Sequence, residues 1–238
     1  MIKSKIKEKE RMFKKTLKSG KRRFQVIKDV NNEKDQLFTK LKADNDSYYY
    51  KYGKTKKTKI CIHFTVGYID SDINVLTKKD NKVSVQYLID SSGNIYNLFN
   101  DEYWSYHLGP KCIGGNKKMS MSTIGIELCN YGPLTKKNNK FYDVYGNLFT
   151  KDENDVLACE YRGQKYFCKL DNEQKDSLVK LLKYLTKKHN IKYEFLMSNE
   201  TFKTAQDAIS FNGIYTHANV RPDKFDLPKQ LYADIIED

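Results

Sequence analysis

The sequence predicts an α/β or α+β domain built on a central β-sheet, with a basic segment in front of it. Apolar stretches of strand length recur between residues 59 and 132, and a long stretch near residue 180 has helical spacing of its leucines. Strands combined with at least one long helix are typical of these two fold classes. The third observation is a concentration of positive charge near the N-terminus, which predicts a separate basic segment.

The basic segment accounts for the whole net charge of the chain. Residues 1–60 contain 20 Lys and Arg against 7 Asp and Glu, whereas residues 61–238 contain 23 of each kind. We therefore expect a basic, helical N-terminal arm at residues 1–57 and a charge-balanced domain at residues 58–238. Scattered apolar positions, interrupted by Gly20 and by Asn31-Asn32, fit two or three short amphipathic helices.

The arm allows two interpretations. It is either a solvated extension or docking helix for a larger assembly, or a segment that attracts nucleic acid, anionic lipid or an anionic wall polymer. Sequence-specific recognition of nucleic acid is not expected, because the aromatic residues form no recognisable module with arginine and the rest of the chain has no basic excess.

The domain begins with strand-like segments and continues into a helix. "KICIHFTVG" (59–67) indicates a buried strand, "VSVQYLIDSSGNIYNLF" (83–99) a hairpin, and "MSTIGIELCNYG" (121–132) another buried strand. "DNEQKDSLVKLLKYLTKKHNI" (171–191) is the clearest helix, with Asp171 or Asn172 as its cap and its leucines on one stripe.

Composition excludes several classes of protein. A chain of 238 residues with 39% hydrophobic residues is long enough for one good-sized domain, whose hydrophobic core needs no disulfide bonds or structural metal ions for stability. No apolar run reaches the roughly 18 residues of a membrane span, and the N-terminus lacks the apolar centre of a signal peptide. The odd number of cysteines, without C-x-x-C spacing, indicates neither a disulfide framework nor a zinc ribbon; they are Cys61, Cys112, Cys129, Cys159 and Cys168.

The four histidines are the best guide to chemistry. His189 closes the long helix, where a cation suits the helix C-terminus. His63 lies inside an apolar strand and is either a satisfied core residue or a ligand. His217 precedes a proline-bracketed loop that contains Asp226. Two histidines and one carboxylate are a known ligand set for catalytic zinc, although spacing alone cannot show that His63, His217 and Asp226 meet.

Five sequence blocks, in this order, resemble the zinc-dependent N-acetylmuramoyl-L-alanine amidases of type 2, which share a fold with peptidoglycan recognition proteins. The blocks are "IHFTVG", "SVQYLIDSSGNIYNLF", "YWSYHLG", "STIGIELCNYG" and "IYTHANVRPDKFDLP", and the resemblance covers roughly residues 58 to 232. It implies an α/β fold with a mixed central β-sheet flanked by helices. It also implies hydrolysis of the amide between N-acetylmuramic acid and L-alanine in peptidoglycan.

The resemblance assigns roles residue by residue. His63, His217 and Asp226 match the three Zn²⁺ ligands, and zinc makes hydroxide available near pH 7. Glu127 matches the strand glutamate beside the metal and would move protons, while Lys224 would face the oxyanion. The "YWSYHLG" block lines the substrate groove in the family, which implies that His107 and Trp104 contact substrate. Tyr87 is one position out of register with a family tyrosine, so no tyrosine is assigned.

The resemblance leaves alternatives open. A non-catalytic peptidoglycan-binding module or a virion structural module on the same fold is the alternative to a zinc hydrolase, and the complete ligand set favours the hydrolase. The absence of a signal peptide fits a bacteriophage endolysin or a virion-associated lysin, made in the cytoplasm and acting on the cell wall after release or as part of the virion. In that case the basic arm would dock to phage virion or tail proteins. A cytoplasmic recycling amidase would also lack a signal peptide.

Overall fold

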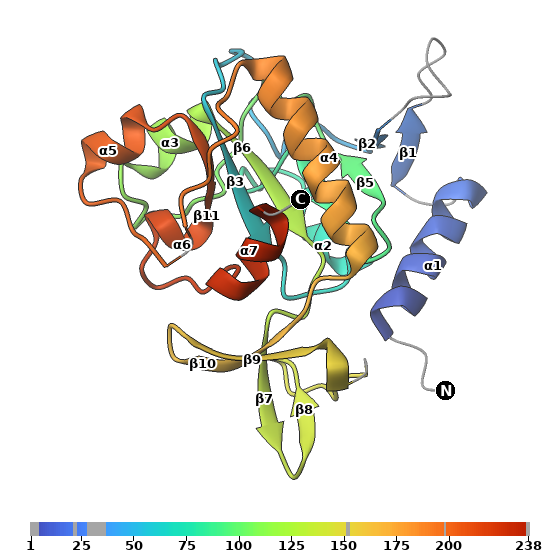
Figure 1. Ribbon diagram of the computed structural model, residues 1–238. Helices are drawn as coiled ribbons and strands as arrows, with labels where there is room; N and C mark the ends of the chain where they lie inside the picture. Colours follow the sequence, from blue (N-terminus) through green and yellow to red (C-terminus); the bar gives the residue numbers. More distant parts are fainter. Residues whose placement is uncertain (1–4, 21–22, 28–36, 151–152, 198, 237–238) are drawn as a thin grey trace.

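The core of the molecule is a mixed seven-stranded sheet in the order β1-β2-β5-β4-β6-β3-β11 (Figure 1). The computed structural model describes residues 5–20, 23–27, 37–150, 153–197 and 199–236. The β2–β5, β4–β6, β6–β3 and β3–β11 pairs are parallel, and the β1–β2 and β4–β5 pairs are antiparallel. The strands of this sheet are β1 (Phe24–Ile27), β2 (Thr39–Ala43), β3 (Lys59–Phe64), β4 (Tyr87–Ile89), β5 (Ile95–Asn97), β6 (Thr123–Leu128) and β11 (Gly213–Thr216).

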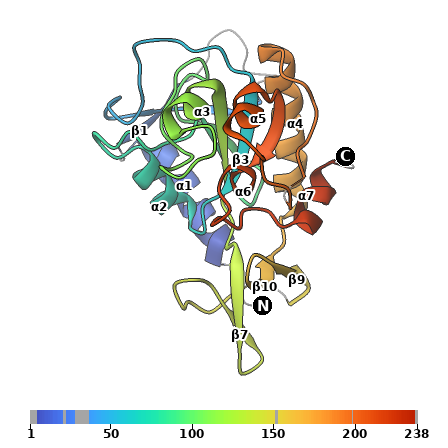
Figure 2. The same cartoon turned by 90° about the vertical axis from the view of Figure 1, so that its left-hand side faces the viewer.

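Helices cover both faces of this sheet, which confirms the expected fold class. On one face, α4 (Asn172–His189) and α7 (Lys229–Ile236) pack through their leucines against apolar side chains of β3, β6 and β11. The other face carries α1 (Lys5–Ser19) and α2 (Ile69–Leu76), together with three short helices near β3 and β11 (Figures 1 and 2). Those are α3 (Asn116–Ser122), α5 (Ala205–Ser210) and α6 (His217–Val220).

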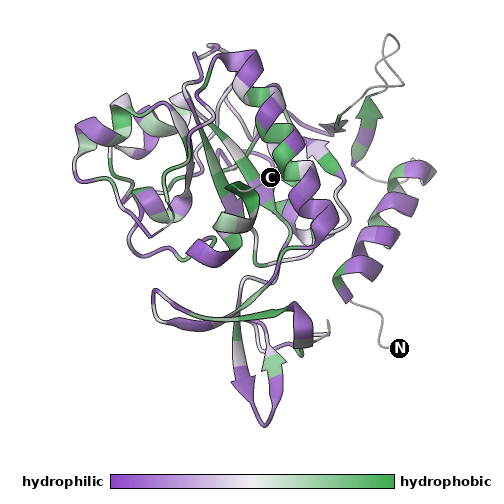
Figure 3. Cartoon of the chain, in the orientation of Figure 1, coloured by the Kyte–Doolittle hydropathy of each residue, from purple (hydrophilic) through white to green (hydrophobic). Residues whose placement is uncertain are grey.

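The alternation of side chains along β3 determines which of its residues face away from the core under α4. In β3, Ile60 and Ile62 belong to the core under α4, whereas Cys61 belongs to the cluster on the opposite face. Successive side chains in a strand point to opposite faces, so His63 lies on the same face as Cys61. The ribbon of α1 is almost entirely hydrophilic, whereas that of α4 alternates between hydrophilic and apolar stretches, as its amphipathic pattern predicts (Figure 3).

A second, four-stranded sheet lies beyond the carboxyl ends of β3 and β6 (Figure 1). Its strand order is β8-β7-β10-β9, with antiparallel pairing throughout. It begins at Pro133, shortly after β6 ends, and its last strand leads into α4. The elements are β7 (Pro133–Lys137), β8 (Lys140–Tyr142), the 3-10 turn η1 (Glu153–Asp155), β9 (Val156–Tyr161) and β10 (Gln164–Cys168). The sequence analysis did not predict this sheet.

The expected helical arm is helical only in part. α1 forms as expected, but residues 24–27 and 39–43 are strands, and β2 pairs in parallel with β5. The reason is visible in "TKLKA", where Leu41 and Ala43 are buried and Lys42 is exposed, a period of two that fits a strand. The expected break at Asn31-Asn32 lies outside the described residues. The division at residue 57 stays a prediction about independent folding.

A buried carboxylate on α1 also binds the arm to the turn between β4 and β5. Glu10 on α1 is 1% exposed, and its oxygens accept hydrogen bonds from Ser91 N at 2.6 Å and from the hydroxyls of Ser91 at 3.0 Å and Ser92 at 2.8 Å. Phe13 on the same helix meets Tyr96 of β5 edge to face. α1 therefore packs on the turn between β4 and β5 and on the face of the sheet.

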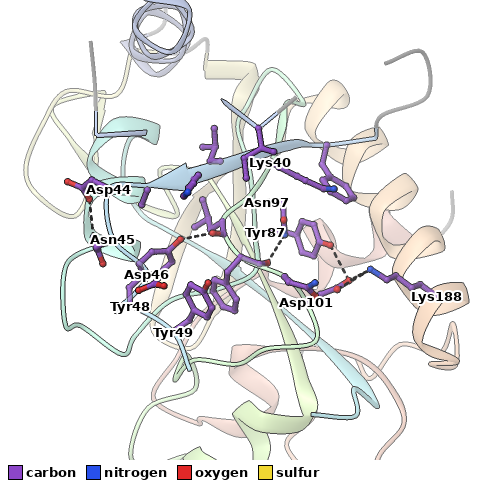
Figure 4. A pocket seen from close by; sticks show the side chains of 18 of the residues that line it. Lys40, Asp44, Asn45, Asp46, Tyr48, Tyr49, Tyr87, Asn97, Asp101 and Lys188 are labelled. Carbon is purple, nitrogen blue, oxygen red and sulfur yellow. Dashed lines mark hydrogen bonds and ion pairs between the residues drawn. The ribbon is translucent and has the colours of Figure 1, made fainter. Parts of the chain in front are cut away.

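Strand β2 also closes a cavity of about 750 Å³ against the end of α4 (Figure 4). Inside it, the Asp101 carboxylate accepts hydrogen bonds from Tyr87 Oη at 3.2 Å, from Lys188 Nζ at 3.0 Å and from His189 Nε2 at 2.9 Å. Burial raises the pKa of Asp101, but the hydrogen bonds from His189 and Lys188 outweigh it and lower the pKa to about 2. The cavity lies where β5 ends and β4 begins, at the opposite end of the sheet from the carboxyl ends of β3, β6 and β11.

Candidate active site

Three side chains that could hold a metal ion converge at the carboxyl end of the central sheet. One ligand atom each of His63, His217 and Asp226 lies within 4.8 Å of the other two. The imidazole rings of His63 and His217 are 4.6 Å apart between centroids, and His217 Nδ1 lies 3.9 Å from Asp226 Oδ2. The structure thus brings together the three residues that the sequence analysis expected as Zn²⁺ ligands, from positions up to 163 residues apart.

Parallel pairing of β11 with β3 creates this proximity. Thr216 at the end of β11 is opposite Ile62, so His217 leaves the sheet beside His63. The turn of α6 is held by Asn219, whose Oδ1 accepts hydrogen bonds from Thr216 N and Thr216 Oγ1. Asp226 reaches back to β3, where its Oδ1 accepts a hydrogen bond from Phe64 N at 3.4 Å.

The hydrogen-bond partner of His217 determines which of its two ring nitrogens carries the proton. Its Nε2 lies 3.0 Å from the carbonyl oxygen of Leu108, and because a carbonyl only accepts, Nε2 carries the proton. Nδ1 then presents its lone pair on the side of Asp226, as a metal ligand requires. Burial lowers the pKa of His217, and burial together with the neighbouring His217 and His107 lowers the pKa of His63. Both rings are therefore neutral, the form in which imidazole binds metals.

Glu127 lies next to His63 in the sheet. The two residues are paired in the register between β6 and β3, so their side chains are neighbours on the same face. Glu127 Oε2 is buried and has no hydrogen-bond partner among the described residues. Burial, followed by the nearby carboxylates of Asp226 and Asp72, raises the pKa of Glu127 well above its usual range. A carboxyl group in this state suits proton transfer near neutral pH.

His107 is in direct contact with the candidate ligand His63, which is closer than expected of a residue that only lines the substrate groove. Its Nδ1 is 3.0 Å from His63 Nε2, its Nε2 is buried without a partner in the described part of the chain, and its side chain lines a cavity. Burial lowers the pKa of His107 to about 3. His107 also forms a second group that could hold a metal, together with Cys61 and His63. Only the resemblance, through the "YWSYHLG" block, pointed to His107.

Cys61 shows none of the features of a nucleophile. It is fully buried, and burial raises the pKa of its thiol well above the ordinary value, so the thiolate is disfavoured.

Lys224 borders an open cavity of about 370 Å³ beside the candidate ligands. His107, His217 and Arg221 line the same cavity. Arg221 donates a hydrogen bond from Nε to Asp223 Oδ1 at 2.7 Å and from Nη1 to the carbonyl oxygen of Leu108 at 3.3 Å. Asp223 is half exposed and is engaged by this pair with Arg221.

Arg162 fixes the loop that carries Lys224 and Asp226, and sequence reasoning missed it. It lies at the tip of the β9–β10 hairpin in the second sheet. Its Nη1 donates to the carbonyl oxygens of Arg221 and Lys224, each at 3.1 Å, and its Nη2 donates to that of Ala218 at 3.0 Å. An arginine in a hairpin turn gives no local signal of such a role.

Trp104 does not line this cavity in the structure. It is 5% exposed and stacks on Tyr50 with ring centroids 4.0 Å apart, and Tyr106 meets it edge to face at 5.2 Å. The ring packs the loop after β5 against the segment before β3. The expected substrate contact by Trp104 therefore has no geometric support, because its aromatic faces are taken up by tyrosines.

The family model for N-acetylmuramoyl-L-alanine amidases (Amidase_2) matches residues 53–226, nearly three quarters of the chain. The chain belongs to this family. The match begins inside the predicted arm and ends at Asp226. Comparison with curated protein sequences gives no significant match.

Among the similar solved structures, AmiD and LysC are described as N-acetylmuramoyl-L-alanine amidases. AmiD from E. coli, in complex with the substrate anhydro-N-acetylmuramic acid-L-Ala-D-gamma-Glu-L-Lys, is 21% identical with a TM-score of 0.48, covering 78% of this chain and 60% of that chain. AmpDh3 from Pseudomonas aeruginosa is 14% identical with a TM-score of 0.46, covering 88% and 66%. The amidase LysC from Clostridium intestinale is 14% identical with a TM-score of 0.42, covering 78% and 91%. The present chain thus spans 60% of the length of AmiD.

The donor set of this amidase-family chain fits a metal ion. Two neutral imidazoles and a carboxylate supply three ligands and leave a coordination position open, the arrangement of catalytic zinc sites. Glu127 Oε2 and His107 Nε2 are buried and have no hydrogen-bond partner among the described residues, as expected where a small polar ligand completes the site. Within the described ranges, none of the helices combines the length and apolarity needed to cross a membrane.

Proposed function

We propose that this chain is a zinc-dependent N-acetylmuramoyl-L-alanine amidase, which hydrolyses the amide between N-acetylmuramic acid and L-alanine in peptidoglycan. The observation that carries the proposal is the convergence of His63, His217 and Asp226 beside Glu127, in a chain of the amidase family. A His-His-carboxylate set, an adjacent carboxyl group with a raised pKa and an open cavity are the parts that metal-assisted amide hydrolysis requires.

Zinc would be held by His63, His217 and Asp226, and when bound it would supply Lewis-acid chemistry and hydroxide near neutral pH. The alternative group of Cys61, His63 and His107 shares His63 but includes a fully buried thiol. The first set is favoured because it combines two imidazoles with a carboxylate, whereas burial disfavours the thiolate of Cys61 that the second set would need.

Three protein groups would transfer the proton, stabilise the oxyanion and orient a metal ligand. Glu127 would accept a proton from the attacking water and donate it to the leaving amide nitrogen, because its carboxyl lies beside the ligands and its raised pKa makes its carboxylate a stronger base than an ordinary one. Lys224 would stabilise the oxyanion that develops on the former carbonyl oxygen, where one such donor is worth roughly 3 kcal/mol in the barrier. Leu108 would orient His217 through its carbonyl oxygen.

The activity is tested by digesting purified sacculi and identifying the products by mass spectrometry. Release of stem peptides with a free L-alanine amino group is the expected result. Glu127→Gln should keep the metal and lose at least about 100-fold in kcat, whereas the exposed Glu160→Gln serves as the matched control. Binding of sacculi without any product release by the metal-loaded protein would identify a peptidoglycan-binding module instead.

The choice of ligand set is tested by metal content. Asp226→Ala should lose stoichiometric zinc, while Cys61→Ala should retain it, measured by elemental analysis of folded protein. The reverse pattern would move the ion to Cys61, His63 and His107.

The setting of the reaction is part of the proposal. We infer that the enzyme is a phage-type lysin that acts on the cell wall after release from the cytoplasm or as part of a virion, with the basic arm as the segment that would contact virion or tail proteins. The lysine-rich outer surface of α1 supports a docking role. Mass spectrometry of purified particles would detect the protein if it is virion-associated, and would not if it is a free endolysin.

A further inference from the structure

The loop between α6 and α7 (residues 221–228) carries Asp226 and ends in a residue that is anchored in the core. Arg162 fixes the first half of the loop through the carbonyl oxygen of Lys224. The second half ends in Leu227 and Pro228, directly before α7. The Leu227 side chain is fully buried and belongs to the apolar core under α4 and α7. The candidate ligand Asp226 is thus the immediate neighbour of a core anchor.

The backbone of Leu227 is strained. Its φ is +50°, in the left-handed region that leucine rarely occupies. Pro228 adds a second restriction, because a proline ring disfavours the right-handed helical region for the residue before it. Strain of this kind persists only where the surrounding structure over-determines the conformation. For Leu227, the burial of its side chain is the constraint that opposes the strain.

Strain at aliphatic residues lies close to the candidate ligands. Seven described residues other than glycine have a positive φ. Four of them are Asn or Asp, which tolerate this region, and Arg162 lies at a hairpin tip. The two aliphatic residues among the seven are Val66 and Leu227, which closely follow His63 and Asp226. Strained backbone that clusters in this way at a site points to a role in its geometry.

The reversal at Leu227 accompanies the return of Asp226 to the edge of β3. Thr65 N donates to β6, so Phe64 N points towards the β11 side, because successive backbone groups of a strand alternate. β11 ends at Thr216, before it reaches the level of Phe64. Asp226 Oδ1 accepts the hydrogen bond from Phe64 N at 3.4 Å in place of a strand carbonyl. Asp226 Oδ2 is then left on the side of His217, 3.9 Å from its Nδ1.

We propose that Leu227 is a positioning residue, whose buried side chain and left-handed backbone together aim the Asp226 carboxylate at His63 and His217. This inference rests on the proposed zinc amidase function and adds to it a residue that is not itself a ligand. The hydrogen bond from Phe64 N is long and holds the carboxylate only weakly. Placement of Asp226 therefore depends on its anchored neighbour, as preorganised metal sites require.

Two substitutions that conserve volume separate the backbone conformation from the packing. Leu227→Met fills a similar space without branching at Cβ, so it tolerates the same φ. Leu227→Ile also conserves volume, but its branched Cβ makes a φ of +50° a genuine outlier. Leu178→Ile is the matched control, because Leu178 lies in the same core on α4 and away from the loop.

The first readout is amide hydrogen exchange of Phe64, measured by NMR on the purified full chain without added zinc. Leu227→Ile should exchange this amide at least about 10-fold faster than the wild type, because Asp226 no longer accepts its hydrogen bond. Leu227→Met and Leu178→Ile should stay close to the wild type. If Leu227→Ile does not fold, Leu227→Ala removes the anchor and gives the same readout. Unchanged exchange at Phe64 would overturn the inference.

The second readout is zinc affinity, measured by competition with a chromophoric chelator. Leu227→Ile should bind zinc at least about 10-fold more weakly than Leu227→Met and the wild type, and saturating zinc should restore part of its amidase activity. Equal zinc affinity of Leu227→Ile and the wild type would show that Leu227 does not position the ligand. A wild type that neither binds zinc nor releases stem peptides would refute the proposed function alone, because exchange at Phe64 reports on Asp226 without metal or substrate.

Discussion

Replacing Arg162 tests whether the second sheet positions the catalytic loop. In Arg162→Ala, the carbonyl oxygens of Ala218, Arg221 and Lys224 each lose a hydrogen bond from a guanidinium at 3.0 to 3.1 Å. Hydrogen bonds to charged groups are worth about 1.5–3 kcal/mol each, and water can replace part of this at a half-buried site. We therefore expect a loss of roughly 2–3 kcal/mol in the free energy of unfolding, concentrated in this loop.

The effect on catalysis should exceed the effect on folding. Lys224 and Asp226, the proposed oxyanion donor and metal ligand, both lie in the loop, and a displacement of about 1 Å in a catalytic group costs on the order of 100-fold in rate. Amidase assays should give a kcat/KM lowered 10- to 100-fold, with most of the loss in kcat, while urea unfolding still shows a cooperative transition.

Chemical rescue separates positioning from simple destabilisation. Added guanidinium at millimolar concentration should restore part of the activity of Arg162→Ala and leave the exposed control Lys165→Ala unaffected. A folded Arg162→Ala protein with wild-type kcat/KM would refute the argument that the β9–β10 hairpin holds the loop.

Three further predictions concern stability and geometry. Glu10→Ala should lower the free energy of unfolding by roughly 2–4 kcal/mol, because it leaves the hydrogen-bond donors of the β4–β5 turn without an acceptor. The control Glu8→Ala, on the exposed side of α1, should change the free energy by less than about 0.5 kcal/mol in urea unfolding. Equal values for the two variants would mean that α1 is not docked on the sheet. Lys57 is buried and its pKa is lowered to about 7, so the unfolded state binds the extra proton between pH 7 and 10.5 and stability should rise with pH. Lys57→Met should flatten that rise, by up to about 1.4 kcal/mol per pH unit, and identical slopes would contradict the assignment. Gly125→Ala places a Cβ 2.7 Å from Val85 Cγ1 and 3.2 Å from His107 Nδ1, so it should lower activity at least several-fold; unchanged activity would show that His107 can move freely.

The local sequence pattern was sufficient to predict secondary-structure elements that are long and regularly periodic. The leucine stripe of residues 171–191 became α4, and the apolar runs around His63 and Glu127 became β3 and β6. Both of these strands are covered on both faces, and that is why they read as nearly continuous apolar segments. The register of β6 with β3 could not be read from either run, because pairing between distant strands leaves no local trace.

The candidate site depended on resemblance for the same reason. Spacing alone left His63 as a core residue or a ligand, and only the ordered blocks connected it with His217 and Asp226. Arg162 was missed because its partners are backbone carbonyls, which every residue possesses. The packing of Trp104 could not be predicted either, because Tyr50, on which it stacks, lies in the segment assigned to the arm, where net charge concealed the packing role of individual residues.

Pairing of β11 with β3 has a consequence for the order in which activity appears. His63 is synthesised 163 residues before Asp226, and the strand that carries His217 to its place is the last one of the sheet. Contacts between such distant segments form late in folding, since a long loop must close first. The candidate ligand set is therefore complete only once β11 has paired with β3. At the proposed zinc site, loss of the ion from a damaged sample would therefore report displacement of the C-terminal segment that carries His217 and Asp226.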